Sequence, residues 1–297
     1  MNRKDFGELI ASLRKDLGWT QAELAEYAGI DNATLSNIER GVKRHLEPET
    51  LYQLANALRL TSLERREFFL GASGLDQAKT VRPPGANDPA QVFEAQAQIN
   101  RLTETMEQVQ LPSHLGDCYG DILAVNSLLL EVFQIESEML KLMIRAEGGF
   151  NNLHVVYGML QSQQAFGNEY SKSALEAIRA FREGSLRYRA TPYYQALLEK
   201  FRDPHKYPLF ERYWRRVSTL DEDKETMISP LLVQHPKYGL LSFNMTSAVT
   251  LTSRGELFLT YFLPMDPGTA NSILGMAEAS GKKVIRLLSW PDKKTLN

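Results

Sequence analysis

The fold of this chain is constrained most by the stretch from residue 20 to residue 41, which specifies two short helices joined by a fixed corner. Thr20 and Glu23 have the spacing of a capping box, which predicts the start of the first helix. Gly29 tolerates the positive φ of a tight corner, and Asp31 can cap the second helix. The spacing of the apolar residues then predicts one buried face, formed by Leu24, Ala25, Ala28, Leu35 and Ile38.

Two helices with a short glycine-containing corner have helix-turn-helix geometry, in which the second helix can enter the major groove of DNA. The strings QAELAEYAG and LSNIERG resemble the phage-repressor-like, or XRE-type, helix-turn-helix, and the resemblance extends over residues 4 to 71. It implies an all-α, five-helix, lambda-repressor-like DNA-binding domain in which Arg14 pairs with Glu39. The alternative interpretation is a helical hairpin that only buries its own core.

The resemblance also implies which residues contact DNA. A recognition helix reads base edges with side chains at its N-terminal end, and asparagine can bond adenine bidentately. By position, Asn32, Ala33 and Asn37 are the expected base-contacting residues, and Gln21 is expected to fix the register on the phosphate backbone. Further phosphate contacts are expected from Thr34 or Ser36 and from Arg40, Lys43 and Arg44. A solvated basic loop is the alternative for residues 40–45.

Composition allows two domains and gives no strong sign of a nucleic-acid partner. The 297 residues, 43% of them hydrophobic, suffice for two ordinary domains, and the net charge is only −2. Residues 1–74 carry ten Lys or Arg and eleven Asp or Glu, so the expected DNA-binding domain is not basic as a whole. Because one such domain buries little surface, we expect a homodimer on a pseudo-palindromic operator in double-stranded DNA.

Residues 75–111 are predicted to be a linker with an amphipathic helix. A polar run with two prolines at residues 82–87 ends the first domain, and Asp88-Pro89 can open a helix. Its apolar residues form a heptad stripe, Val92, Ala95, Ile99, Leu102, Met106 and Val109. The stripe lasts less than three heptads, so two interpretations stay open: packing on the next domain, and pairing of two chains in a dimer.

The rest of the chain, residues 112–291, predicts an α+β domain with an antiparallel sheet flanked by helices. Residues 116–126 indicate two short strands around a Gly-Asp turn, followed by a helix. Three later runs are typical of strands joined by tight turns: Ile228–His235, Leu240–Leu251 and Glu256–Leu263. Between the two groups the sequence predicts helices at 171–186, 192–202 and 208–217.

Five segments resemble the MmyB-like regulators, which join an XRE-type helix-turn-helix to a PAS-like ligand-binding domain. They are GDILAVN at 120–126, NL at 152–153, SLR at 185–187, PLFERYW at 208–214 and LFLTY at 257–261. The resemblance implies a transcription regulator whose PAS-like domain binds a small molecule. Binding would then favour one of two arrangements of the DNA-binding domains.

The candidate ligand site combines apolar side chains with arginines. Methionines and aromatic residues suit an adaptable apolar cavity, and a guanidinium can bind a carboxylate bidentately. The candidate pocket residues are Met143, His154, Met159, Trp214, Phe243, Met245 and Phe258. The candidates for binding an anionic head group are Arg187, Arg189 and Arg215. We expect a small amphipathic anion such as a fatty acid; ordinary core packing and surface helix charge are the alternatives.

Several classes of function find no support in the sequence. The single cysteine, Cys118, excludes an internal disulfide and a thiolate zinc cluster, and the five histidines show no metal-binding or catalytic spacing. We therefore expect no enzyme activity and no cofactor, with His154 as a haem ligand a minor alternative. No apolar stretch reaches the ~20 residues of a membrane span, and there is no signal core, so a cytoplasmic protein is expected. The alternative function is a protein-interaction or dimerisation module without a small-molecule ligand.

Overall fold

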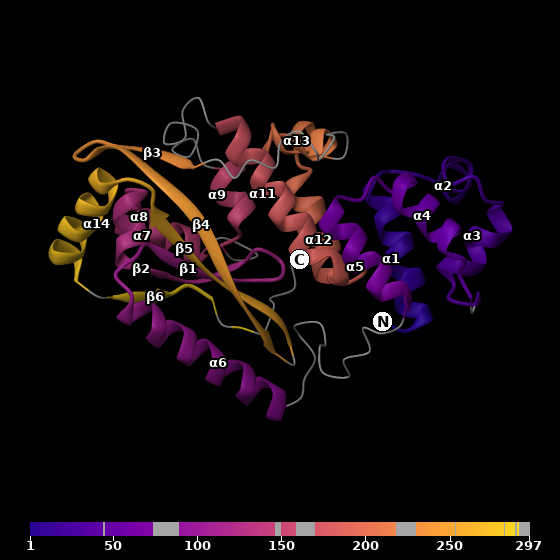
Figure 1. The fold of residues 1–297 in the computed structure, drawn as a ribbon, viewed down its shortest axis with the longest axis horizontal. Helices are drawn as coiled ribbons and strands as arrows, with labels where there is room; N and C mark the ends of the chain where they lie inside the picture. Colours follow the sequence, from indigo (N-terminus) through magenta and orange to yellow (C-terminus); the bar gives the residue numbers. More distant parts are fainter. Residues whose placement is uncertain are drawn as a thin grey trace.

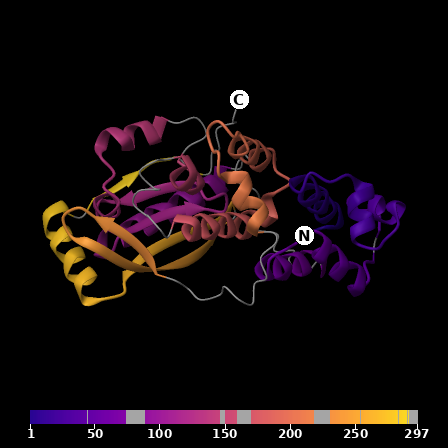
Figure 2. The same cartoon turned by 90° about the horizontal axis from the view of Figure 1, so that it is seen from above.

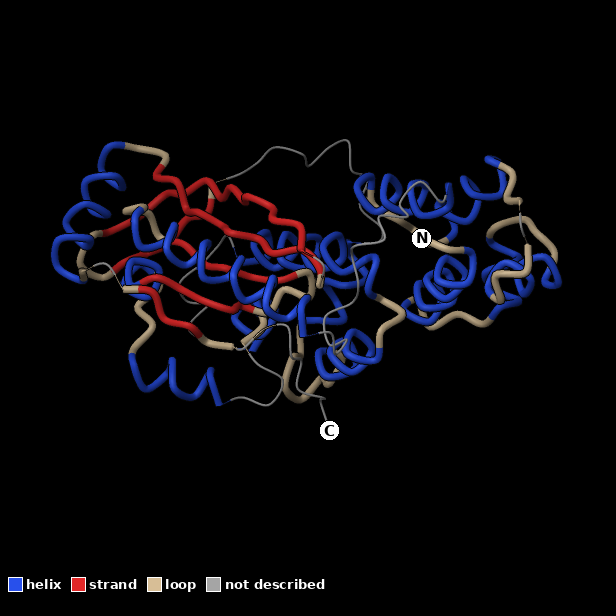
Figure 3. The backbone as a smooth tube through the Cα atoms, turned by 90° about the horizontal axis from the view of Figure 1, so that it is seen from below, coloured by secondary structure: helices blue, strands red, loops and turns tan. Residues whose placement is uncertain are grey.

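The computed structural model describes residues 1–43, 45–73, 89–145, 150–158, 170–217, 230–252, 254–281, 283–288 and 290, with the backbone alone at 89–93, 142–144 and 280. The described chain forms two bodies, which we call the helical domain (α1 to α5) and the sheet domain (α6 to β6). All strands of the described residues lie in the sheet domain, whereas the other body consists of helices and connecting loops (Figure 3).

The helical domain contains the five predicted helices: α1 (Arg3–Asp16), α2 (Gln21–Tyr27), α3 (Asn32–Glu39), α4 (Pro48–Ala57) and α5 (Ser62–Ser73). The predicted caps are present. Thr20 Oγ1 accepts from the N–H of Glu23, the Glu23 carboxylate accepts from the N–H of Thr20, and Asp31 accepts from the N–H of Thr34. Gly29 has the expected positive φ, 63°. The predicted buried face is confirmed, since all five of its apolar residues lie in the core of the domain.

Helix α1 packs so closely against the end of α3 that only glycine fits at one position. A Cβ atom on Gly7 would lie 2.3 Å from the backbone oxygen of Glu39 and 2.5 Å from that of Ile38. From the same helix, the Arg14 guanidinium donates to both carboxylate oxygens of Glu39, at 2.7 and 3.0 Å. This confirms the expected pair, which ties the first helix to the third.

The sheet domain is built on one antiparallel sheet, with the described strands in the order β3-β4-β5-β1-β2-β6. The strands are β1 (Ser113–Asp117), β2 (Ile122–Asn126), β3 (Leu231–His235), β4 (Gly239–Thr252), β5 (Gly255–Pro264) and β6 (Val284–Arg286). The predicted antiparallel sheet is confirmed, although the expected strand residues 228 and 229 lie outside the described residues. The sequence does not predict β6, because three residues are too few to show an alternating pattern.

Helix α6 (Pro89–Gln108) runs along one face of the sheet (Figure 1). Its stripe contacts the sheet of its own chain, since Ala95, Ile99 and Met106 are buried in one cluster with Leu259 of β5 and with Trp290. The hypothesis that these stripe residues pair two chains is therefore wrong, because contacts within the chain already bury them. The other interpretation, packing on the next domain, is confirmed.

Helices cover the opposite face of the sheet. In β5, Leu257 and Leu259 join the α6 cluster, whereas Phe258 and Phe262 face the other helices, as the alternation of a strand requires. These helices are α7 (Ser127–Val132), α8 (Ser137–Arg145), α9 (Asn152–Gly158), α11 (Tyr170–Ser185), the 3₁₀ helix η2 (Leu186–Tyr188), α12 (Pro192–Phe201), α13 (Phe210–Val217) and α14 (Pro267–Ser280). The predicted helices after residue 126 and at 171–186, 192–202 and 208–217 are confirmed; α8, α9 and α14 are not predicted.

An aromatic core lies where α9, α11, α12 and α13 meet. It includes Tyr157, Phe181, Tyr194, Phe201, Phe210 and Trp214. Phe210 stacks on Phe201 and on Trp214, with ring centroids 5.6 and 5.5 Å apart. Helices α11 and α12 separate the sheet from the helical domain (Figures 1 and 2), so this core lies directly behind the surface on which the helical domain rests.

Candidate functional site

The start of α3 is open to solvent. Asn32 and Ala33 are exposed, and Asn37, one turn further along, is half-buried. Helix α3 lies at the end of the molecule remote from the sheet domain (Figure 1), so the sheet domain does not cover it. The expected base-contacting residues are therefore accessible to a double helix.

Glu39, at the end of α3, fixes three helices relative to one another. Besides both bonds from Arg14, its carboxylate accepts a hydrogen bond of 2.7 Å from Gln21 Nε2 at the start of α2. Arg14 Nη1 also donates to the carbonyl of Trp19 at 2.7 Å. The amide group of Gln21 is thus held against Glu39, and its phosphate contact stays a prediction.

The expected phosphate-contacting residues follow the same helix. Arg40 is exposed, and its Nη2 donates to Asn37 Oδ1 at 2.7 Å, so these two candidates form one hydrogen-bonded pair. Thr34 Oγ1 donates to Asp31 at 2.6 Å, and that hydrogen bond lowers the pKa of Asp31. Ser36 and Lys43 are half-buried, and Arg44 lies outside the described residues.

The candidate ligand residues do not converge on one site. Phe243 is fully buried in a cluster with residues of α7 and α14, whereas Phe258 packs against the aromatic core. His154 Nδ1 shares a hydrogen bond of 2.7 Å with the Tyr207 hydroxyl, and burial lowers the pKa of His154.

Four other candidate ligand residues also lie apart from one another or outside the described residues. Met245 is 49% exposed on β4. Arg215 lies on the surface of α13 and pairs with Glu211, 2.9 Å away. The side chain of Met143 and the whole of Met159 lie outside the described residues.

Arg187 and Arg189, the expected ligand-binding arginines, pair in the structure with carboxylates of the helical domain. Arg187 donates from Nε and Nη2 to Glu67, at 2.9 and 2.5 Å. Arg189 donates from Nη2 to Glu64, and its Nη1 lies 3.8 Å from Asp16. We call this contact of α1 and α5 with α11, η2 and α12 the domain interface.

The centre of the domain interface is a buried cluster of charges. Glu64 has no exposed surface, and Arg182 donates to it from Nε and Nη2 at 3.0 and 2.8 Å. Burial alone would raise the pKa of Glu64, but Arg182 and Arg189 lower it to about 2. Burial raises the pKa of Asp16 to about 6, against the opposing effects of Arg189 and Tyr194. The cluster therefore holds one firmly ionised carboxylate and one that is reluctant to ionise.

The sequence alone predicts no role for Glu64, Asp16 or Arg182. One signal for Arg182 exists in the pattern. It lies four residues after Ile178 on the buried face of α11, and an arginine in such a stripe indicates a buried ion pair. The identity of its partner cannot be deduced from spacing, because Glu64 is 118 residues away.

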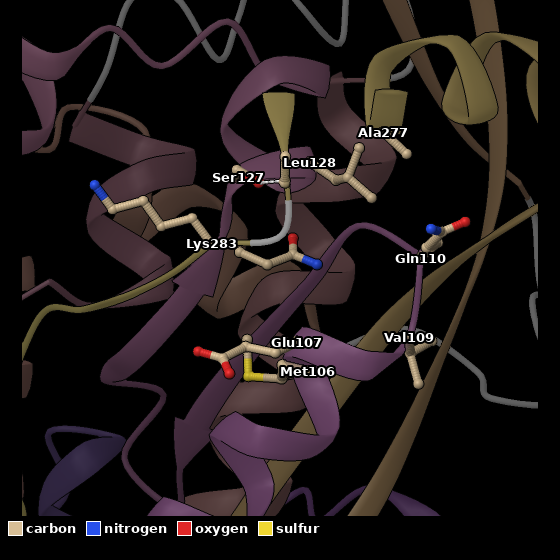
Figure 4. Close-up of a pocket in the computed structure, with 10 residues that line it drawn as sticks. Met106, Glu107, Val109, Gln110, Ser127, Leu128, Ala277 and Lys283 are labelled. Carbon is tan, nitrogen blue, oxygen red and sulfur yellow. Dashed lines mark hydrogen bonds between the residues drawn. The ribbon is translucent and has the colours of Figure 1, made fainter. Parts of the chain in front are cut away.

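Two small hollows border the described residues. One, of about 20 Å³, is lined by Met106, Glu107, Val109, Gln110, Asn126, Ser127, Leu128, Ala277, Gly281 and Lys283. The Lys283 amine points away from the other lining side chains (Figure 4). The second, of about 10 Å³, lies at the domain interface beside Asp16 and Trp214. Each has room for about one water molecule, so neither accommodates a fatty acid in this conformation.

Within the described residues, no helix is long and apolar enough to cross a membrane. The same residues contain no group of three or more His, Cys, Asp or Glu side chains placed to hold a metal ion.

Comparison with known families divides the chain in the same way as its fold. Residues 10–65 match a helix-turn-helix family, and residues 96–273 match the family described as MmyB-like transcription regulator ligand binding domain. The first match falls on α1 to α5 and the second on the sheet domain, well over half of the chain.

Curated relatives share a smaller part of the chain. The competence pilus inhibition repressor of Acinetobacter baylyi is 29% identical over 108 residues, which are 34% of this chain and 94% of that protein. The HTH-type transcriptional repressor RghR of Bacillus subtilis is 37% identical over 57 residues, 19% of this chain and 42% of that protein. An uncharacterized HTH-type transcriptional regulator of Sinorhizobium fredii, y4dJ, is 40% identical over 62 residues, 21% of this chain and 79% of that protein.

Proposed function

The chain belongs to the family of MmyB-like transcription regulators, and from that premise we propose that a small amphipathic anion, such as a fatty acid, controls its affinity for an operator. The protein is a DNA-binding transcription regulator with a ligand-binding domain. We propose the division into a DNA-binding domain at 1–74, a linker at 75–111 and a PAS-like domain at 112–291. The observation that carries the DNA half is the uncovered start of α3, with Asn32 and Ala33 exposed.

The charge of the helical domain supports DNA binding more than its composition indicates. Among its eleven acidic residues, Asp16, Glu64 and Glu67 face arginines of the sheet domain. With these three neutralised, ten basic residues outnumber the eight remaining acidic ones. The rest of the helical domain therefore carries a small net positive charge, which favours contact with phosphates.

We propose that two copies bind two half-sites of one operator. Base contacts are assigned to Asn32, Ala33 and Asn37, with Gln21, Thr34, Ser36, Arg40, Lys43 and Arg44 on the sugar-phosphate backbone. A single domain of this kind buries too little surface for tight specific binding, and half-sites lie about one helical turn apart in dimers of this geometry. Sedimentation of the protein with and without a two-half-site duplex tests this stoichiometry.

The proposed ligand occupies the interior between the sheet and its helices. Phe243 and Phe258 pack in clusters between the sheet and its helices, and His154 shares a hydrogen bond with Tyr207 of the same aromatic surroundings, which suit an acyl chain. Arg187 and Arg189 contribute through the domain interface rather than by a direct contact. Among the described residues Phe243 has no exposed surface, so a ligand beside it requires this packing to open. Native mass spectrometry of the purified protein tests for a co-purified ligand, and adding myristate should raise the melting temperature.

One observation favours the alternative, a protein-interaction module. Strand β4 exposes four apolar side chains to solvent, and an exposed apolar patch is typical of a protein contact surface. They are Leu240, Met245, Val249 and Leu251. A mobility shift on the DNA upstream of the gene separates the two functions. A shift that Asn32→Ala weakens supports the regulator, and no shift at micromolar protein supports the interaction module.

A further inference from the structure

The helical domain rests on one corner of the sheet domain, formed by the end of α11, by η2 and by the start of α12. Leu186 of η2 is 1% exposed and lies in the hydrophobic core of the helical domain. At the same corner, Ser12 Oγ donates to the carbonyl of Arg189 at 2.7 Å and accepts from Gln195 Nε2 at 2.7 Å. The sheet domain thus supplies a residue that completes the core of its neighbour.

Charge complementarity makes this contact specific. Across the ion pairs of the domain interface, the carboxylates belong to the helical domain and the guanidinium groups to the sheet domain. Glu64 binds Arg182 and Arg189, and Glu67 binds Arg187 at the rim. An orientation that buried Glu64 away from Arg182 and Arg189 would leave a buried charge without a partner, which costs several kcal/mol per ion. The two domains therefore have one strongly preferred relative orientation.

Trp214 connects this charge cluster to the aromatic core of the sheet domain. The guanidinium carbon of Arg182 lies 5.5 Å from the centroid of the Trp214 ring, and that of Arg202 lies 5.9 Å from it. Both arginines then reach the helical domain, Arg182 at Glu64 and Arg202 at the carbonyl of Asp16. Trp214 also stacks on Phe210 of the aromatic core. Repacking of this core that displaced the Trp214 ring would therefore disturb its contacts with both arginines.

The domain interface leaves the DNA surface free. Helix α3 lies at the opposite end of the helical domain from α12 (Figure 1). Movement at the interface therefore does not cover or uncover the base-contacting residues, but it turns α3 as a rigid body. In a protein with two such domains, turning them alters the separation of the two recognition helices.

From these contacts we infer that the corner of α11, η2 and α12 transmits the state of the ligand-binding domain to DNA. Arg182 is the positioning residue, because it contacts Trp214 inside one domain and Glu64 inside the other. The rigid orientation that it sets allows two recognition helices to meet two half-sites at one spacing. This inference rests on the proposed function, in which two copies of the chain bind one operator.

The test uses the rim pair Arg187 and Glu67, whose side chains are 28% and 27% exposed, so that charge reversal does not bury a new charge. Wild-type protein first selects its site from random duplexes. Fluorescence anisotropy then measures DNA affinity for four proteins: wild type, Glu67→Lys, Arg187→Glu and the double variant. Each protein is tested on the selected site, on one isolated half-site, and on sites with two base pairs added or removed between the half-sites. Glu138→Lys makes the same charge change on α8, at an exposed ion pair. Arg182→Gln repeats the test at the buried centre.

Each single reversal should weaken binding to the selected site by about tenfold or more. When the helical domain is no longer held in one orientation, the effective concentration of the second helical domain at the second half-site falls. Affinity for the isolated half-site should stay unchanged, and the altered spacings should be tolerated better. The double variant should regain the wild-type affinity and spacing preference, and Glu138→Lys should keep both. Wild-type spacing preference in Glu67→Lys, or no recovery in the double variant, would overturn the inference alone. A wild-type protein without any spacing preference would overturn both it and the proposed two-copy binding.

Discussion

The carboxylate of Glu64 and the guanidinium of Arg182 lie in different domains, yet they form two hydrogen bonds of 3.0 and 2.8 Å with both side chains almost fully buried. Buried ion pairs stabilise little relative to an apolar pair of the same shape, but breaking one leaves an uncompensated charge. The pair therefore selects which surfaces of the two domains meet. Because α3 belongs to the helical domain, the pair also sets the orientation of α3 relative to the sheet.

We expect Glu64→Gln to uncouple the unfolding of the two domains. The variant keeps the shape of the side chain but removes the charge that Arg182 and Arg189 bind, at a cost of about 3–5 kcal/mol. Separating the two domains then costs less free energy than keeping Arg182 and Arg189 buried against a neutral side chain. Differential scanning calorimetry should show one transition for wild type and two for the variant. Glu138→Gln, the same change at an exposed position of α8, should keep one transition; a single transition in Glu64→Gln as well would refute the role of this pair.

The stability of the protein should fall as pH rises from about 4 to 7, relative to an Asp16→Asn variant. The pKa of Asp16 is raised from 3.8 to about 6, so the folded state holds its proton more tightly than the unfolded chain. A contribution of about 3 kcal/mol is therefore present below pH 3.8 and is lost as pH rises through 6. Urea unfolding at several pH values measures the difference between the two proteins. Asp5→Asn, exposed on the same helix, should follow the wild-type curve; parallel curves for wild type and Asp16→Asn would contradict the prediction.

Gly7→Ala should destabilise the helical domain by about 3 kcal/mol or more and reduce DNA binding. The new Cβ atom would lie 2.3 Å from a backbone oxygen of α3, and backbone cannot move aside as a flexible side chain can. The matched control is Gly275→Ala in α14, whose Cβ would meet only the Tyr238 hydroxyl, at 3.9 Å. That change should be neutral or stabilise by up to about 1 kcal/mol, since alanine favours a helix. Equal effects of the two substitutions in thermal unfolding would show that the close approach of α1 and α3 is unimportant.

Asn32→Ala and Arg40→Ala should weaken DNA binding in different ways. Asn32 is assigned to a base, so its loss should cost about 1–3 kcal/mol on the preferred site and relax the preference at one base pair. Arg40 is assigned to a phosphate, so its loss should weaken all sequences alike and lower the salt dependence by about one unit. Binding to a panel of single-base variants at two salt concentrations distinguishes these outcomes. Uniform weakening by Asn32→Ala would remove it from the base-contacting residues.

The sequence predicts those features of the fold that depend on residues close together in the chain. The capping pairs of α2 and α3 and the positive φ of Gly29 act within a few residues, so the helix-turn-helix follows from the sequence alone. The stripe of α6 is different, because periodicity identifies a buried face without identifying what covers it. Three of its residues proved to face the sheet of the same chain.

The arginines illustrate the same limit. The sequence predicts that Arg187 and Arg189 bind the anionic head group of a ligand, whereas in the structure both pair with carboxylates of the protein itself. The partners Glu67 and Glu64 are 120 and 125 residues away and belong to the other domain. No spacing rule connects residues so far apart, because their contact depends on how two complete domains dock. The residue type therefore predicts an anionic partner at these positions, but not that the partner is a carboxylate of the other domain.

In the proposed function, ligand binding in the sheet domain changes the affinity of α3 for its operator. The most direct test is the anisotropy isotherm of the wild-type protein on its selected two-half-site duplex, measured with and without saturating myristate. A coupling of 1–3 kcal/mol, common in allosteric proteins, corresponds to a shift of about 5- to 150-fold in the dissociation constant. We predict a shift in this range, the loss of that shift in Glu67→Lys, and its return in the double variant with Arg187→Glu. Superimposable isotherms, with myristate bound as seen by native mass spectrometry, would contradict it.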